Sequence, residues 1–108
     1  MKSNVFTIPP FDRQLKRLAK KFPSLKAEFA KLIEELENNP EKGTALVNQC
    51  YKIRLAVASK GKGKSGGARV ITHFQVIENS VFLLSIYDKS EQENISDKEI
   101  SYLLAFIR

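Results

Sequence analysis

Six basic residues and no acidic residue lie between Gly43 and Ile77, and this imbalance is the strongest chemical signal in the sequence. The six are Lys52, Arg54, Lys60, Lys62, Lys64 and Arg69. The chain of 108 residues has 18 lysines and arginines against 12 aspartates and glutamates, so the net charge of +6 comes from this one segment. A concentrated positive field attracts polyphosphate by displacing its counterions. The stretch predicts binding to nucleic acid, above all RNA. The alternative is a surface that only keeps the protein soluble, but such surfaces usually mix positive and negative charges.

Strand alternation is expected to bring three cations of this segment together with Lys89, which lies beyond it. Lys52 and Arg54 share one face of a predicted strand over Tyr51–Ala58, and the other face is apolar. Arg69 begins the strand expected to pair with it, and Lys89 follows the end of the next strand. Because neighbouring strands lie about 4.8 Å apart, these side chains are expected to converge on one exposed face. Like charges held together repel each other, which suits phosphate binding better than stability.

A glycine-rich loop adds three more cations beside this face. The loop, Ser59–Gly67, holds four glycines and three lysines, and it is predicted to be mobile and extended. Its lysines at 60, 62 and 64 are expected to capture an RNA backbone as a flexible clamp. They are poorer candidates for chemistry, because no sheet fixes them.

Such a cluster could also cleave RNA through the neighbouring 2′-hydroxyl. That reaction needs a base for the hydroxyl proton, cations for the crowded phosphate, and an acid for the leaving oxygen, and it needs no metal. A lysine surrounded by cations loses its proton more readily and could be the base, whereas an arginine stays charged and holds the phosphate.

Other candidate residues each have a plainer interpretation. His73, the only histidine, lies on the same side as Arg69 by alternation and could move protons, or it could be a structural residue partly buried under the loop. Tyr87 could stack on a base or pack in the core. Asp88 could orient a cation or simply end a strand. Cys50, the only cysteine, cannot form an internal disulfide and is expected to be inert and half-buried.

The elements that must position these residues follow from hydrophobic spacing. A short strand over Val5–Ile8 stops at two prolines, and two amphipathic helices follow, separated by Pro23, the second with Ser24 as N-cap. Three strands and a terminal helix, which starts at the S-x-x-E sequence of Ser96, complete the chain. The predicted strands are Tyr51–Ala58, Arg69–Ile77 and Val81–Asp88. The order β-α-α-β-β-β-α predicts one α+β domain over residues 1–108, with an antiparallel sheet and a helical hairpin on one face.

The composition and the N-terminal residues narrow the class of protein further. No apolar run approaches the roughly 18 residues that a membrane span needs, and the first residues lack the apolar core of a secretory signal. A cytoplasmic protein that neither spans a membrane nor holds a metal through clustered Cys and His is therefore expected.

Three stretches resemble the RelE/ParE superfamily of bacterial type II toxin–antitoxin toxins, and most of all its HigB branch. They are Tyr51–Arg54, the run SKGKGKSGGARVI over Ser59–Ile71, and LLSIYDKSE over Leu83–Glu91. The resemblance spans roughly residues 43–100, and the two preceding helices agree with the family's order of elements. It implies a RelE-like microbial RNase fold without a cofactor. It also implies a metal-independent toxin that cuts translated mRNA in the ribosomal A site, and a partner antitoxin of the helix-turn-helix kind.

Carried over by position, Lys52, Arg54 and Arg69 match the family's cationic strand positions, and Lys89 matches a basic residue after the last strand. Some RelE-type toxins use a tyrosine near the C-terminus as base, but the residues around Ile95 offer none. The base is therefore open among Lys52, Lys89 and His73, in that order. Two other functions remain: a gyrase poison of the ParE kind, which generally lacks the cationic set, and a toxin without activity that only binds its antitoxin.

Overall fold

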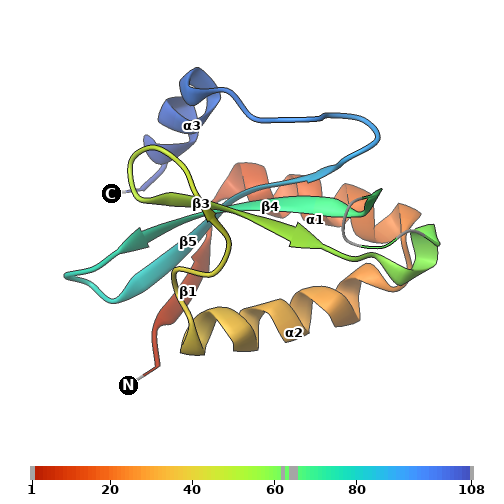
Figure 1. Ribbon diagram of the computed structural model, residues 1–108, viewed down its shortest axis with the longest axis horizontal. Coiled ribbons are helices and arrows are strands. Elements are labelled where there is room, and N and C mark those ends of the chain that lie inside the picture. The colour runs from red at the N-terminus through yellow and green to blue at the C-terminus, as the bar shows by residue number, and fades with distance from the viewer. Residues whose placement is uncertain (1, 62, 64–65, 108) are drawn as a thin grey trace.

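The computed structural model describes residues 2–61, 63 and 66–107, and these form an α+β fold with one helical hairpin and one sheet (Figure 1). In chain order the elements are β1 (Asn4–Thr7), α1 (Pro9–Lys21), α2 (Leu25–Asn38), β2 (Thr44–Ala45), β3 (Cys50–Leu55), η1, a 3₁₀ turn (Ala58–Lys60), β4 (Ala68–Gln75), β5 (Ser80–Asp88) and α3 (Asp97–Leu104). The predicted α+β class and the order of its elements are confirmed. The two-residue strand β2 was not predicted, because so short a strand has no period of its own.

The sheet is mixed rather than wholly antiparallel. Its order is β1-β5-β4-β3-β2, and each pair is antiparallel except β1 and β5, which run parallel. The prediction of an antiparallel sheet is therefore wrong for its first strand. That strand pairs Asn4 with Ser80, and a contact between residues so far apart leaves no local pattern in the sequence.

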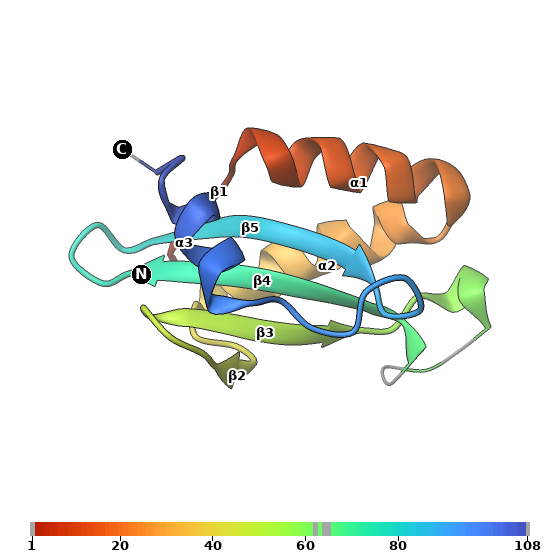
Figure 2. The same ribbon diagram turned by 90° about the horizontal axis from the view of Figure 1, so that it is seen from above.

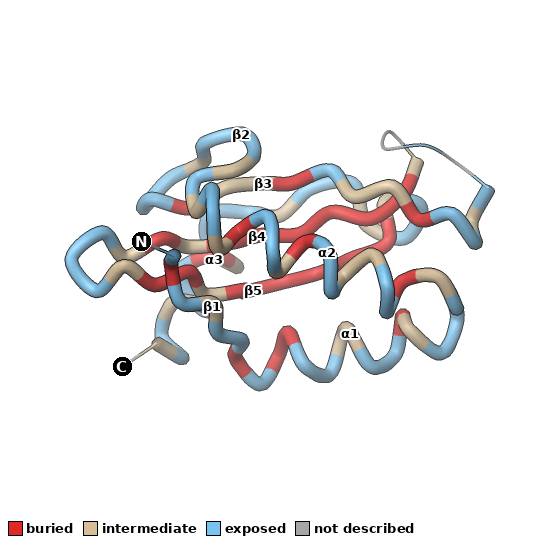
Figure 3. The backbone as a smooth tube through the Cα atoms, turned by 90° about the horizontal axis from the view of Figure 1, so that it is seen from below, coloured by how far each residue is buried: buried red, intermediate tan, exposed pale blue. Residues whose placement is uncertain are grey.

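The helices lie on both sides of this sheet. α1 runs beside β5, α2 returns antiparallel to it across one face, and α3 lies over the opposite face (Figure 2). Buried residues concentrate in β4 and β5, the two strands that are covered from both sides (Figure 3). Gln14 of α1 closes the edge of β5 beyond β1, because its side-chain oxygen accepts the Ile86 N–H at 3.0 Å.

The two predicted helix starts differ in their chemistry. The Ser96 hydroxyl accepts the Glu99 N–H at 3.1 Å, as its S-x-x-E sequence predicts. Ser24 does occupy the N-cap of α2, but it makes no cap hydrogen bond. Its hydroxyl instead donates to Glu28 at 3.2 Å and accepts the Ser59 N–H at 2.9 Å, so it joins the helix to the loop after β3.

At Gly67 the backbone lies so close to the end of β3 that no side chain fits there, and this gives a testable prediction. A Cβ on Gly67 would lie 2.1 Å from the Leu55 carbonyl oxygen, whereas one on Gly63 would have no atom of the described residues within 4 Å. Gly67→Ala should therefore lower the free energy of unfolding by about 1–3 kcal/mol, as overpacking generally does. Gly63→Ala is the matched control and should change it by less than about 0.5 kcal/mol. Equal urea midpoints for the two variants would contradict this close approach.

Candidate nucleic-acid interface

Two arginines and a tyrosine form a row across the middle of the sheet. Arg54 of β3 faces Arg69 of β4, and Arg69 in turn faces Tyr87 of β5. Lys52 lies two residues from Arg54 on the same face, so three of the four predicted strand cations are brought together. Side chains at directly opposed positions are about 5 Å apart at their Cβ atoms. The sheet thus places the two arginines at directly opposed positions of neighbouring strands.

Packing settles which face this row occupies. Ile53, Val70 and Ile86 alternate with the row, pair with one another and are buried. Ile53 also lines a cavity with Leu32 of α2, so the apolar row points toward the helical hairpin, and strand alternation puts Lys52 and Arg69 on the other face. Arg54 belongs to that other face by alternation but also lines the cavity beside α2.

The cationic face is less open than the sequence suggests. Arg54 is exposed and Lys52 half-buried, but Arg69 is only 4% exposed and Tyr87 only 3%. The segment that links β5 to α3 passes over this side of the sheet, and α3 packs there with Ile100 and Leu103 buried (Figure 2). The expectation of four freely exposed cations is therefore wrong for Arg69, because tertiary packing covers it.

One hydrogen bond ties Lys52 to the covering segment, and another holds Arg69 to its own strand. The Lys52 ammonium donates to the Asn94 side-chain oxygen at 3.3 Å, and an Arg69 guanidinium nitrogen donates to the Ala68 carbonyl at 3.1 Å. Burial raises the pKa of Tyr87, the Arg69 charge opposes that rise and the Glu99 carboxylate adds to it. Among the described residues no partner meets the Tyr87 hydroxyl. With its ring covered, Tyr87 has no face free to stack on a base in this conformation.

Lys60 does not belong to a mobile clamp. Its side chain is 7% exposed, and its ammonium forms an ion pair with the buried carboxylate of Asp88. The same ammonium donates to the Gly67 carbonyl at 3.3 Å and to the Ser90 hydroxyl at 3.2 Å. The prediction that Lys60 belongs to a flexible clamp is therefore wrong, because a buried carboxylate holds its side chain, whereas RNA binding by Lys60 stays a prediction. Lys62 and Lys64 lie outside the described residues.

Asp88 is the anion at the centre of this contact. Burial would raise the pKa of Asp88, but the Lys60 ammonium, the Ser90 N–H and the Lys21 ammonium outweigh it and lower that pKa. Lys21 lies 3.9 Å away at the end of α1. Asp88 thus orients a cation, one of the two roles its sequence position allowed.

The remaining candidates lie apart from the row. Lys89 is half-buried just past β5, and its backbone N–H donates to the Gly67 carbonyl at 3.1 Å. His73 faces Cys50, four residues along β4 from Arg69, which is about 13 Å in a strand. Its Nδ1 lies 2.9 Å from the Asn48 carbonyl oxygen, so as the neutral ring it donates there.

Burial shifts the pKa values of His73 and Cys50 and so determines which of their forms is present. It lowers the pKa of His73, against the opposing effect of the Asn48 carbonyl, so the ring is neutral at pH 7. Cys50 is fully buried rather than half-buried, and burial raises its pKa to about 11. The thiol therefore stays protonated, in agreement with its predicted inertness.

Three residues that contact or influence this region were not predicted from the sequence. Asn94 contacts Lys52, Ser90 contacts Lys60, and Glu99 acts on Tyr87. Each acts on a residue of a different element. Asn94 and Ser90 lie in the loop after β5, and Glu99 is recognisable in the sequence only as part of the S-x-x-E start of α3, so no local pattern reveals these contacts. In the parts of the chain that the structure describes, no three His, Cys, Asp or Glu side chains gather as they would around a metal ion. None of the helices there is long and apolar enough for a membrane span.

Comparison with known proteins assigns the family. Residues 11–106 match the family model described as the RelE toxin of the RelE/RelB toxin–antitoxin system. The chain belongs to the RelE toxin family. It is one of the toxins of toxin–antitoxin systems, whose RelE members are paired with a RelB-type antitoxin.

Solved structures of RelE proteins share the fold at low sequence identity. A free double arginine-to-alanine variant of E. coli RelE is 19% identical, with a TM-score of 0.62 and full coverage of both chains. The isolated E. coli RelE toxin is 18% identical, with a TM-score of 0.57 over 97% of this chain and 99% of its own. The Mycobacterium tuberculosis RelBE2 toxin–antitoxin complex contributes a chain that is 17% identical, with a TM-score of 0.59 over 82% of this chain and 92% of its own.

The buried ion pair yields a prediction about stability and its pH dependence. Lys60→Met leaves the Asp88 carboxylate buried without its main partner, which should lower the free energy of unfolding at pH 7 by about 3 kcal/mol. Because the pKa of Asp88 is lowered by folding, the pair's stabilisation is present above pH about 4 and is lost as the pH falls below it. The difference between wild type and variant, measured by urea unfolding, should therefore shrink at acidic pH.

The double variant Lys60→Met, Asp88→Leu controls for this prediction. It removes both charges, so most of the lost stability should return. A double variant as unstable as Lys60→Met alone would show that the loss comes from packing rather than from a stranded charge.

Proposed function

We propose that this RelE-family toxin is a ribosome-dependent endoribonuclease that cleaves translated mRNA in the A site without a metal ion. The observation that carries the proposal is the row of Arg54 and Arg69 on paired strands, with Lys52 on the same face. A cytoplasmic site of action follows from the ribosome as target. The likeness of the Ser59–Ile71 run to the HigB branch supports a place in that branch.

The proposed reaction is an in-line transfer on the RNA chain. The 2′-oxygen attacks the adjacent phosphorus and forms a cyclic phosphate, while the bond from phosphorus to the 5′-oxygen breaks. One proton passes from the 2′-hydroxyl to a base, and another reaches the leaving 5′-oxygen from an acid. The protein must supply these proton transfers and offset the extra negative charge on the phosphate oxygens.

The geometry suggests different roles for the three cations. Arg54 is exposed at the rim of the row and fits contact with the phosphate oxygens, which a guanidinium binds through two donors. Arg69 lies beneath the segment that follows β5 and fits a role in the positive field and in positioning Arg54. Lys52 lies diagonal to Arg69, about 7–8 Å away by sheet geometry, and stays the first candidate for the base. Lys89 stays the second.

Removal of the exposed guanidinium tests the phosphate role. Arg54→Ala should lower the rate of mRNA cleavage by purified toxin on programmed ribosomes by about a hundredfold, the loss typical of one group that stabilises transition-state charge. Lys2→Ala is the matched control, because Lys2 is exposed and lies near Asn79, at the other end of β5 from Tyr87. Mapped 5′ ends of cellular mRNA after induction should show cuts for the control and none for Arg54→Ala. Full cleavage by a folded Arg54→Ala protein would refute the site.

The same experiment separates the alternatives. Intact mRNA together with a DNA-damage response on induction of the wild-type chain would identify a gyrase poison. Intact mRNA without any growth arrest would identify a protein that only binds its antitoxin.

Charge-conserving variants test the base. Lys52→Arg keeps the positive charge but cannot accept a proton at neutral pH, so it should bind ribosomes normally while single-turnover cleavage falls by about a hundredfold or more. His73→Gln should cleave nearly as fast as wild type, because the His73 ring is engaged with Asn48 and lies well away from Arg69. A large loss in His73→Gln, with normal cleavage by Lys52→Arg, would reassign the base to His73. Lys89→Arg is the corresponding test for Lys89.

A further inference from the structure

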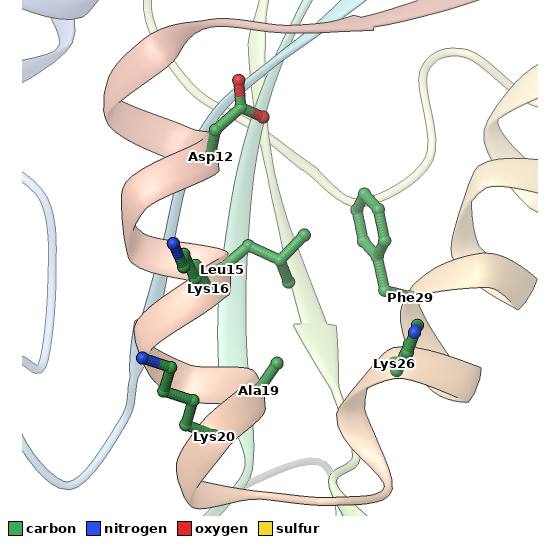
Figure 4. A pocket seen from close by; sticks show the side chains of 7 residues that line it. All are labelled: Asp12, Leu15, Lys16, Ala19, Lys20, Lys26 and Phe29. Carbon is green, nitrogen blue, oxygen red and sulfur yellow. The ribbon is translucent and has the colours of Figure 1, made fainter.

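Hollows on the two sides of the sheet lie away from the cationic row, and they differ in their chemistry. On the side of the helical hairpin, a groove of about 410 Å³ separates α1 from α2, with Leu15 and Ala19 pointing toward Phe29 (Figure 4). Its rim is mainly basic and consists of Asp12, Lys16, Lys20 and Lys26. The hollow on the other side, over β1, β5 and the end of β4, holds two aromatic rings and suits a different ligand.

Two stacked phenylalanines form the centre of this second hollow, and we call them the aromatic platform. Phe6 of β1 lies directly opposite Phe82 of β5, and the ring centroids are 5.4 Å apart with 27° between the ring planes. Phe6 is 47% exposed and Phe82 is half-buried. The hollow that they line has a volume of about 600 Å³. The pair therefore presents a flat apolar surface on which a further ring can stack.

Strand register places the aromatic platform on the same side of the sheet as the cationic row. Phe82 lies opposite His73 of β4, and His73 is four residues from Arg69, an even number that keeps both on one face. Four residues span about 13 Å of strand, so the platform is too far from the row to take part in the chemistry. Lys52 and Arg54 attract polyphosphate to this face, which favours RNA over a protein as the ligand.

Polar side chains surround the two rings. Asn4 and Gln75 contribute amides, and Glu78 contributes a carboxylate. Among the described residues, none of these three side chains forms a hydrogen bond or an ion pair. The Ser80 hydroxyl, by contrast, donates to the Glu78 carbonyl oxygen at 3.0 Å. The border thus offers donors and acceptors beside a flat apolar surface, the combination by which proteins recognise unpaired bases.

From the stacked rings and their polar border, we propose that the aromatic platform binds one unpaired base of RNA. The base stacks on the exposed ring of Phe6, while Gln75 and Glu78 form hydrogen bonds with its edge. Because a side-chain amide can pair with two groups of adenine at once, adenine should bind best. The inference deepens the proposed function and rests on it in naming RNA as the ligand. On the ribosome, both the message and ribosomal RNA offer unpaired bases.

Removal of the exposed ring tests the stacking. Phe6→Leu keeps an apolar side chain without a ring, so binding of a short, unstructured oligoadenylate to purified toxin should weaken by about tenfold in fluorescence anisotropy titrations. Phe6→Trp offers a larger ring and should bind at least as tightly as wild type. Phe106→Leu is the matched control, because Phe106 is 38% exposed just after α3 and does not line this hollow.

Salt and base identity give two further readouts. Added salt should weaken RNA binding by every protein, but the ratio between wild type and Phe6→Leu should stay constant, because stacking is not electrostatic. A ratio that disappears at high salt would contradict stacking. Wild type should bind oligoadenylate more tightly than oligouridylate, and Gln75→Ala should reduce that preference.

Ribosomes distinguish the two sources of the base. If Phe6→Leu binds vacant ribosomes more weakly than wild type does, the base belongs to ribosomal RNA. If the loss requires a message in the A site, the base belongs to mRNA. Either result supports the aromatic platform, whereas equal binding by the two proteins to both kinds of ribosome would overturn it.

The outcomes separate this inference from the proposed function. Equal oligoadenylate affinities of Phe6→Leu and wild type, in a toxin that cleaves mRNA, would refute the aromatic platform alone. Weaker binding by Phe6→Leu, in a toxin that leaves mRNA intact, would refute the proposed cleavage alone. A similar loss in Phe6→Trp or Phe106→Leu would show disturbed folding rather than lost stacking and would overturn the inference. Unchanged RNA binding with weakened antitoxin binding would assign the platform to a protein and overturn it too.

Discussion

The ion pair between Lys60 and Asp88 is the contact on which the arrangement of this protein depends. Asp88 ends the last strand, Lys60 begins the glycine-rich loop, and Lys21 reaches the same carboxylate from the end of α1. Three elements that are distant in sequence thus meet at one buried anion. Because an unpaired buried carboxylate is strongly unfavourable, the loop, the helix and the strand end are fixed together. This junction also sets where the chain leaves β5 to cross the cationic face.

The cationic face combines two requirements that conflict in a small protein. A phosphate-binding site favours cations held close together, whereas stability favours their separation or neutralisation. The fold meets both by rigid strand pairing, which holds Arg54 and Arg69 side by side, and by partial cover from the segment after β5. Arg54 stays exposed at the rim while Arg69 is buried. A preorganised charge of this kind needs no rearrangement when a phosphate arrives, which is what makes such sites effective.

Two surfaces of opposite character lie on the two sides of one sheet. The side of α3 carries a polar, cationic row fixed by hydrogen-bonded strands, and the side of the helical hairpin carries an apolar groove with a basic rim. The first surface is polar and charged, whereas the second is apolar at its centre, so the two sides of the sheet differ in the chemistry that they present.

The sequence by itself determined the elements and the charges. Apolar spacing predicted both N-terminal helices, the alternation around Lys52 and Arg54 predicted their shared face, and the S-x-x-E sequence predicted the start of α3, since each signal is local to its own element. Only the tertiary structure decided which of these charges are available. The pairing of β1 with β5, the cover over Arg69 and the capture of Lys60 by Asp88 all join residues distant in sequence. The sequence divides the basic stretch into strand cations and loop cations, but it does not show which of them are buried or paired. The fold separates them because burial and ion pairing depend on neighbours that only three-dimensional packing brings together.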